Sequence, residues 1–207
     1  MQFGLSQEQI LLQDNVNRFL DDNSALDRVR TYADGGEDAD IWAGLAELGI
    51  PALLIPEAQG GIGLQPLDAA IVAECLGSHI APTPFLESAV MAPTALVASG
   101  GDHDELLAEI AAGTTRIGIA FGEAIKRRNN AGVTVKDGRM SGTSMYAFDA
   151  EANAYLVADQ HQHIYLVRAD DPGLKRSHLA TVDKTRRTVE LNYDNVAANL
   201  VSDDASV

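Results

Sequence analysis

The chain has 207 residues, and 46% of them are hydrophobic, which is enough apolar material for one large domain or two small ones. Its formal net charge of −15 repels phosphate groups, so we expect no nucleic-acid partner. No apolar run approaches the roughly 20 residues that cross a bilayer, so we expect no membrane span. The first residues resemble no secretory signal, and a lone cysteine, Cys75, fits a cytoplasmic location.

The first 112 residues are acidic and carry the signals of helices. They hold 18 acidic and 3 basic side chains, whereas residues 113–207 hold 12 of each. Ser6 and Gln9 have the spacing of a capping box, and apolar residues follow at helical spacing. Further helices are predicted over residues 25–32, 41–48, 66–77, 85–98 and 105–111, with Pro93 kinking or splitting the helix at 85–98. The segment 51–66 is rich in proline and glycine and is predicted to be irregular.

After Gly113 the apolar residues change from a helical period to alternation, which is typical of strands. Strands are predicted at 116–121, near 133–135, and at 154–158, 164–167 and 188–193. Five or six short strands favour an antiparallel barrel or sandwich. We therefore predict an α+β protein of two domains, an all-α helical bundle over 1–112 and a β domain over 113–200, followed by a frayed tail at 201–207.

Several short segments, taken in order, carry a resemblance to a known family. They are Trp42–Gly49, the Pro-Glu-x-x-Gly-Gly-x-Gly loop at 56–63, Glu74–Gly77, Ile110–Gly113, Gly138–Thr143, Tyr155–Ala158 and Val189–Val196. Their order and spacing resemble the helical and middle β domains of the acyl-CoA dehydrogenase family over nearly all of the chain. The resemblance implies FAD as cofactor, an acyl-CoA thioester as substrate, and α,β-dehydrogenation as the reaction of an oxidoreductase in lipid metabolism.

The family has a third part, a C-terminal helical bundle that supplies the catalytic glutamate and much of the subunit interface. We expect this bundle to be absent from the 207 residues, so no catalytic residue is assigned. The resemblance also implies a homologous subunit or a second copy of the chain as partner. Two hypotheses follow: the chain is part of an FAD-dependent acyl-CoA dehydrogenase, or it is a non-catalytic subunit that has lost its own flavin site and pairs with a full-length homologue.

Two segments stand where the family holds its flavin. The segment Ala120–Glu123 stands in the place of a Thr-Glu-Pro segment, with Gly122 replacing the threonine and Ala124 the proline. The threonine hydroxyl is lost, but the backbone N–H groups of Phe121 and Gly122 can still donate to a flavin. Tyr146 and Phe148 match an aromatic and a small hydroxyl residue of the family, and the ring of Tyr146 can stack on the isoalloxazine. A plain strand end at Phe121 and Gly122, and an aromatic pair inside a β core at Tyr146 and Phe148, remain the alternatives.

The basic cluster Lys126, Arg127 and Arg128 is the candidate substrate-binding site, because guanidinium groups bind the phosphates of coenzyme A or FAD in pairs of hydrogen bonds. A second cluster, Lys184, Arg186 and Arg187, could meet phosphates in the same way, and solvated loop charge is the commoner explanation of both clusters. Gly60–Gly63 is interpreted as a structural turn, and Cys75 as a small core residue. The histidines show no metal-ligand spacing, so we assign no metal site.

Overall fold

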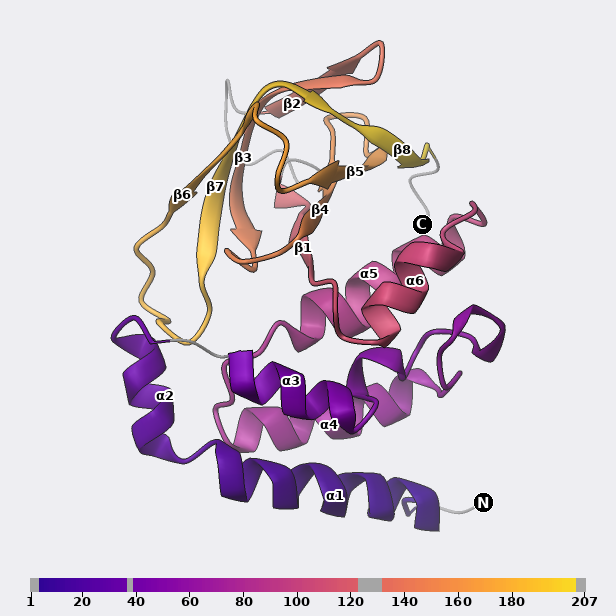
Figure 1. Cartoon of the computed structure of the whole chain (residues 1–207), viewed down its shortest axis with the longest axis vertical. Coiled ribbons are helices and arrows are strands. Elements are labelled where there is room, and N and C mark those ends of the chain that lie inside the picture. The colour runs from indigo at the N-terminus through magenta and orange to yellow at the C-terminus, as the bar shows by residue number, and fades with distance from the viewer. Residues whose placement is uncertain (1–3, 37–38, 123–131, 204–207) are drawn as a thin grey trace.

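The helices and strands of the computed structural model form two stacked layers, and all the helices precede all the strands in the chain (Figure 1). Residues 4–36, 39–122 and 132–203 are described. The α-helices are α1 (Gln7–Asn23), α2 (Leu26–Ala33), α3 (Ala39–Glu47), α4 (Pro66–Ser78), α5 (Ala92–Ala98) and α6 (Asp104–Ala111). Short helical segments are η1 (Ile50–Ala52), η2 (Glu57–Gln59) and the π-helical η3 (Phe85–Met91). Within the described ranges, no helix is both long and apolar enough to cross a membrane.

The strands form one eight-stranded sheet in the order β6-β7-β3-β1-β4-β5-β8, with β2 paired to β3. They are β1 (Ile117–Ala120), β2 (Gly132–Lys136), β3 (Arg139–Phe148), β4 (Ala154–Ala158), β5 (Ile164–Arg168), β6 (Leu174–His178), β7 (Thr188–Ala197) and β8 (Asn199–Ser202). The α+β class with separate helical and sheet parts is confirmed. The sheet is mixed rather than antiparallel throughout, because β1 and β4 run parallel, and in its described strands it is open rather than a closed barrel.

Local signals set the helix ends. The Ser6–Gln9 capping box is confirmed: the Gln9 backbone N–H donates to Ser6 Oγ over 3.2 Å, and the Ser6 N–H donates to Gln9 Oε1 over 3.0 Å. Pro66 opens α4 at a position where its missing N–H is unneeded. The predicted break near Pro93 is confirmed as the junction of η3 and α5. The π-helical turn there accommodates the hydrogen bond that proline cannot make.

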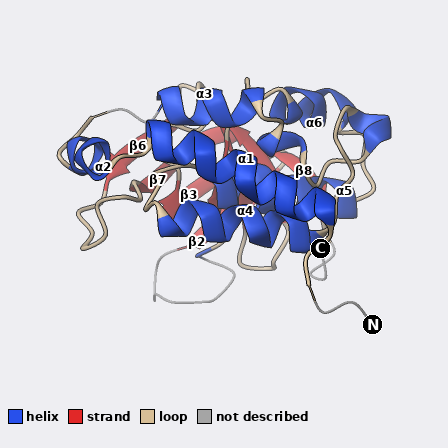
Figure 2. Ribbon diagram, turned by 90° about the horizontal axis from the view of Figure 1, so that it is seen from below, coloured by secondary structure: helices blue, strands red, loops and turns tan. Residues whose placement is uncertain are grey.

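The buried apolar side chains form three clusters, and one of them joins the two layers. One lies inside the sheet and one lies among the helices. The third is shared, because side chains of α5 and α6 such as Leu96 and Ile110 pack against strand residues such as Ile119 and Leu156. Figure 2 looks onto the helical layer with the strands behind it. The two parts predicted from the sequence therefore share a core, and the boundary at residue 112 remains a prediction.

The expected frayed tail is wrong at its start. Val201 and Ser202 belong to β8, are 9% and 8% exposed, and extend the sheet beside β5, where Ser202 pairs with Ile164. Val201 is held because its side chain joins the shared apolar cluster. Residues 204–207 lie outside the described residues. Both β6 and β8 were missed, because β6 has the polar sequence of an exposed edge strand and β8 is very short.

Candidate functional site

The two segments proposed to meet a flavin lie side by side across the β1–β3 pair. Ile119 is opposite Phe148 in an antiparallel register, and β1 ends at Ala120, directly before Phe121. Gly122 follows, and a Cβ added to it would lie 2.9 Å from the backbone oxygen of Met145. Strand pairing therefore brings these four candidate residues together at one place on the sheet. It also gives Gly122 a packing reason, since a side chain there would have to displace a neighbouring strand.

A β-bulge turns the aromatic side chains of β3 outward. Ser144 pairs with Leu191 and Ala147 with Val189, so β3 has one residue more than β7 between these two pairs. The extra residue lets Ser144 and Ala147 both point into the core, at 0% exposure, and leaves Tyr146 57% exposed. Tyr146 also has a φ of +58°, which is uncommon for a residue with a side chain.

The exposure of these rings excludes one of the two alternatives for Tyr146 and Phe148, the aromatic pair inside a β core. Phe148 is 36% exposed, so the two rings do not form an aromatic pair inside a β core. Phe121 is half-buried and packs against the shared apolar cluster of the two layers. Whether these residues contact a flavin stays a prediction.

One face of the Phe148 ring is already covered by the protein itself. The guanidinium carbon of Arg186 lies 5.3 Å from the ring centroid, at a distance typical of a cation–π contact. Arg186 also forms an ion pair with Glu87 of η3, whose side chain is 3% exposed. Burial raises the pKa of the Glu87 carboxyl, and the charge of Arg186 opposes that shift.

The neighbouring Arg187 is paired as well. Its guanidinium carbon lies 4.1 Å from the centroid of the Tyr32 ring, and it donates to Glu151 over 2.6 Å. The interpretation of the second basic cluster as solvated loop charge is therefore wrong for Arg186 and Arg187. The candidate phosphate-binding residues Lys126, Arg127 and Arg128 lie outside the described residues, so their role also stays a prediction.

A buried ion pair fixes the end of β3. Asp149, 9% exposed, accepts two hydrogen bonds from Arg116, over 2.9 and 2.7 Å. The Tyr155 hydroxyl donates to the Asp149 backbone oxygen over 2.8 Å, and burial raises the pKa of Tyr155 to about 12. The two hydrogen bonds between Arg116 and Asp149 hold the start of β1 against the end of β3. Sequence reasoning missed both this pair and Glu87–Arg186, because the partners are far apart in the chain.

With this geometry in hand, the chain can be compared with known proteins. The family profile described as "Acyl-CoA dehydrogenase, N-terminal domain" matches residues 6–114, which is more than half of the chain. The chain belongs to the acyl-CoA dehydrogenase family.

Curated relatives and solved structures of acyl-CoA dehydrogenases agree with this assignment. The chain is 32% identical over 151 residues to acyl-CoA dehydrogenase FadE27 of Mycobacterium tuberculosis, which covers 70% of this chain and 40% of that protein. A variant of the steroid ACAD Tcur3481–Tcur3483 superposes with a TM-score of 0.82 at 27% identity, covering 95% of this chain and 57% of that one. The ChsE4–ChsE5 complex from Mycobacterium tuberculosis gives 0.80 at 24% identity, covering 96% of this chain and 57% of that one. The chain thus spans about half the length of these relatives.

The other residues singled out in the sequence of this acyl-CoA dehydrogenase relative are the glycine turn, the cysteine and the possible metal ligands. The turn at Gly60–Gly63 is confirmed, because Gly60 and Gly63 have φ values of +84° and +70°. Cys75 is 2% exposed within the helical core, and burial raises the pKa of its thiol. In the part of the chain that the structure describes, no three His, Cys, Asp or Glu side chains come together as a metal site.

Proposed function

We propose that this chain forms the helical and sheet parts of an FAD-dependent acyl-CoA dehydrogenase and provides one wall of the flavin and acyl-CoA site. The flavin, when bound, would accept the β hydride of the acyl thioester, while the α proton would go to a base that is not assigned in this chain. The task left to the residues of this chain is to hold the cofactor and the substrate in register.

The observation that carries the proposal is the position of Phe121 and Gly122, directly after β1, beside the bulged part of β3 that holds Tyr146. The bulge in β3 presents the Tyr146 ring to solvent, and an exposed aromatic face suits a flat isoalloxazine. Gly122 packs closely against the backbone of Met145 in β3, which keeps its own backbone beside the bulge. The residues present therefore fit the group, with Phe148 at the border of the surface because Arg186 covers one of its faces.

A titration of the purified chain with FAD, followed by flavin fluorescence and absorbance, tests this proposal. We expect saturable flavin uptake, weakened by up to about tenfold in Tyr146→Ala, because an aromatic contact contributes about 0.5–1.5 kcal/mol and 1.4 kcal/mol is a factor of ten in Kd. Leu200→Ala is the matched control, since Leu200 is an exposed apolar residue at the other side of the sheet. An unchanged Kd in Tyr146→Ala would show that Tyr146 does not contact the flavin.

A second candidate function is a non-catalytic subunit that pairs with a full-length homologue. Two observations favour it: Gly122 supplies no hydroxyl, and Arg186 already occupies one face of Phe148. The similar ChsE4–ChsE5 structure is itself a complex of two different chains. This alternative predicts a colourless protein that takes up no flavin but sediments together with a full-length homologue when the two are coexpressed. Flavin uptake by the isolated chain would contradict it.

A further inference from the structure

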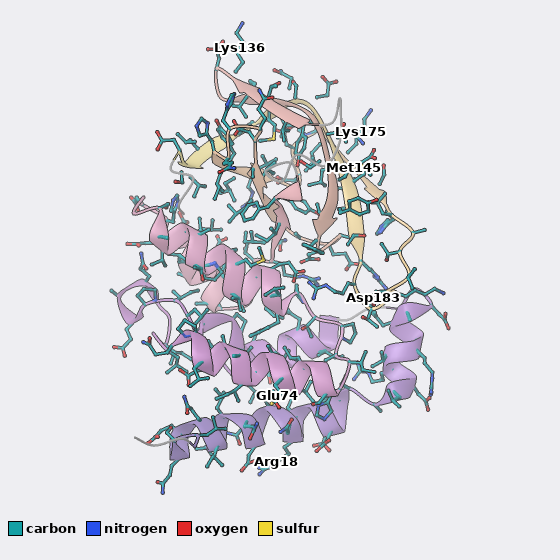
Figure 3. The ribbon with its side chains drawn as sticks, turned by 180° about the vertical axis from the view of Figure 1, so that it is seen from behind. Arg18, Glu74, Lys136, Met145, Lys175 and Asp183 are labelled. Atoms are coloured by element: carbon teal, nitrogen blue, oxygen red, sulfur yellow. The ribbon has the colours of Figure 1, made fainter. Side chains whose placement is uncertain are left out.

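The loop between β6 and β7, residues 179–187, extends from the sheet toward the helical layer (Figure 1). We call these residues the β6–β7 loop. Figure 3 labels Asp183 in this loop, close to α2 at the edge of the helical layer. The shared apolar cluster joins the layers through α5 and α6, so the β6–β7 loop is a second attachment between them, made by charged side chains.

Arg186 makes the first contact of this attachment. It donates to Glu87 Oε1 on η3, and its guanidinium also lies over the Phe148 ring. The second oxygen of Glu87, Oε2, is buried and has no hydrogen-bond partner among the described residues. A half-satisfied buried carboxylate is costly when charged, and Arg186 is the cation that makes its charge tolerable.

Arg187 makes the second contact. It donates to the backbone oxygens of Tyr32 and Gly36 at the end of α2, and its guanidinium lies over the Tyr32 ring. One end of the β6–β7 loop is therefore tied to η3 by an ion pair with a buried carboxylate and to α2 by hydrogen bonds and a cation–π contact. The two arginines are adjacent in sequence, so loosening one contact gives the other more freedom.

We propose that the β6–β7 loop is a proton-sensitive latch: charged Glu87 holds Arg186 and closes the loop onto the helical layer, and protonation of Glu87 loosens the loop and uncovers Phe148. A neutral carboxyl accepts a hydrogen bond without charge assistance, and such bonds are about half as strong. The latch controls access to Phe148 at the end of β3, and it acts whether or not a flavin binds there.

Further charged groups lie at this junction. Arg116 and Asp149 form their own ion pair, and Asp149 adds a repulsion that also favours neutral Glu87. Arg187 pairs with Glu151, whose side chain is 45% exposed. The other titratable groups around Arg186 and Arg187 in the described structure are Tyr32, beneath Arg187, and His178 and Lys184 near the two ends of the β6–β7 loop; Glu87→Gln separates the protonation of Glu87 from theirs. A proton added to Glu87 therefore changes the charge balance at Arg186.

The direction of the pH effect follows from burial. Because the pKa of folded Glu87 is raised, Glu87 takes up its proton at a higher pH than an exposed glutamate does. The folded state binds this proton more tightly than the unfolded chain, so protonation of Glu87 does not itself drive unfolding. The latch can open while the remainder of the molecule stays folded.

A spin label at Val182→Cys tests the latch, because Val182 is fully exposed in the β6–β7 loop and Cys75 is buried from the labelling reagent. In the otherwise native chain we expect label mobility to rise reversibly between pH 8 and pH 4, which lies below the ordinary glutamate pKa of 4.5, with near-ultraviolet circular dichroism unchanged. Glu87→Gln, which mimics the protonated carboxyl, is expected to show the mobile label at both pH values. Arg186→Gln removes the same contact from the other side and is expected to be mobile already at pH 8.

Glu151→Gln is the matched control, since it removes a carboxylate partner of Arg187 but leaves the Glu87–Arg186 pair intact. It should retain the transition between pH 8 and pH 4. The proposal is overturned if the label in the native background is equally mobile at both pH values, or if Glu87→Gln keeps the native transition. Arg186→Gln decides the matter if Glu87→Gln fails to fold, because a label as restrained at pH 8 as in the native background would also refute the latch.

Discussion

Ser88→Ala is expected to weaken the junction of the helical layer and the sheet. Ser88 lies in η3 at 0% exposure, and its hydroxyl oxygen accepts from the Ile117 N–H over 2.9 Å and donates to the Ile117 backbone oxygen over 3.2 Å. Ile117 lies beyond the end of β3, because β3 ends at Phe148 opposite Ile119. The Ser88 side chain therefore stands in for a missing strand at the edge of β1.

The cost can be worked from these contacts. Removing the hydroxyl leaves a buried N–H and a buried C=O without their partner, and each unsatisfied group costs about 1–3 kcal/mol. We expect a loss of about 2–6 kcal/mol in the free energy of unfolding, at the lower end if a water enters the space. With a urea m-value of about 2–3 kcal/mol per molar, the unfolding midpoint should fall by about 1 M or more.

Urea unfolding followed by Trp42 fluorescence and by far-ultraviolet circular dichroism measures this loss. Trp42 reports on the helical cluster, whereas circular dichroism reports on both layers, so coincident transitions would show that the layers unfold together. Ser177→Ala on the exposed edge strand β6 is the control and should leave the midpoint unchanged. A midpoint in Ser88→Ala within about 0.2 M of the native value would refute the reasoning.

Two further predictions concern the helical layer. Gly61→Ala should lower the melting temperature sharply, because the new Cβ would lie 1.9 Å from the Ile55 backbone oxygen, whereas Gly77→Ala in α4 meets nothing within 4 Å and should be neutral or stabilising by up to about 1 kcal/mol; equal melting temperatures would contradict this. The pKa of His79 is raised by hydrogen bonds to a backbone oxygen of α4 and to Asp21, so its contribution to stability is present in full below the unfolded pKa and is lost as pH rises through the folded pKa. Asp21→Asn should lower the His79 pKa measured by NMR titration, and an unchanged titration would show that the Asp21 contact is not formed in solution.

Features that depend on neighbours in sequence were predictable. The Ser6–Gln9 capping box, the opening of α4 at Pro66 and the break near Pro93 each follow from residues a few positions apart. The resemblance to the acyl-CoA dehydrogenase family also rests on local motifs, and the family profile bears it out. At the candidate site, the sequence placed Phe121, Gly122, Tyr146 and Phe148 together only through that resemblance.

Features that depend on pairing between distant residues could not be predicted from the sequence. Alternating apolar residues mark a strand but not the direction of its partner, so the parallel β1–β4 pair could not be read from the sequence. Lys126, Arg127 and Arg128 were singled out as a run of charges, whereas the arginines shown to hold the layers together are Arg186 and Arg187, whose partners lie about a hundred residues or more away.

By itself the sequence determined the kinds of elements, their order, the acidic character of the helical part and the family. These follow from local propensity, period and motif spacing, which are properties of short stretches of chain. The tertiary structure decided which elements share a core, which strand ends lie side by side and which charges are buried. Those outcomes depend on packing between distant residues: the bulge that exposes Tyr146 lies where β3 pairs with β7, and the pKa of Glu87 is raised because η3 is buried between neighbouring helices and β1.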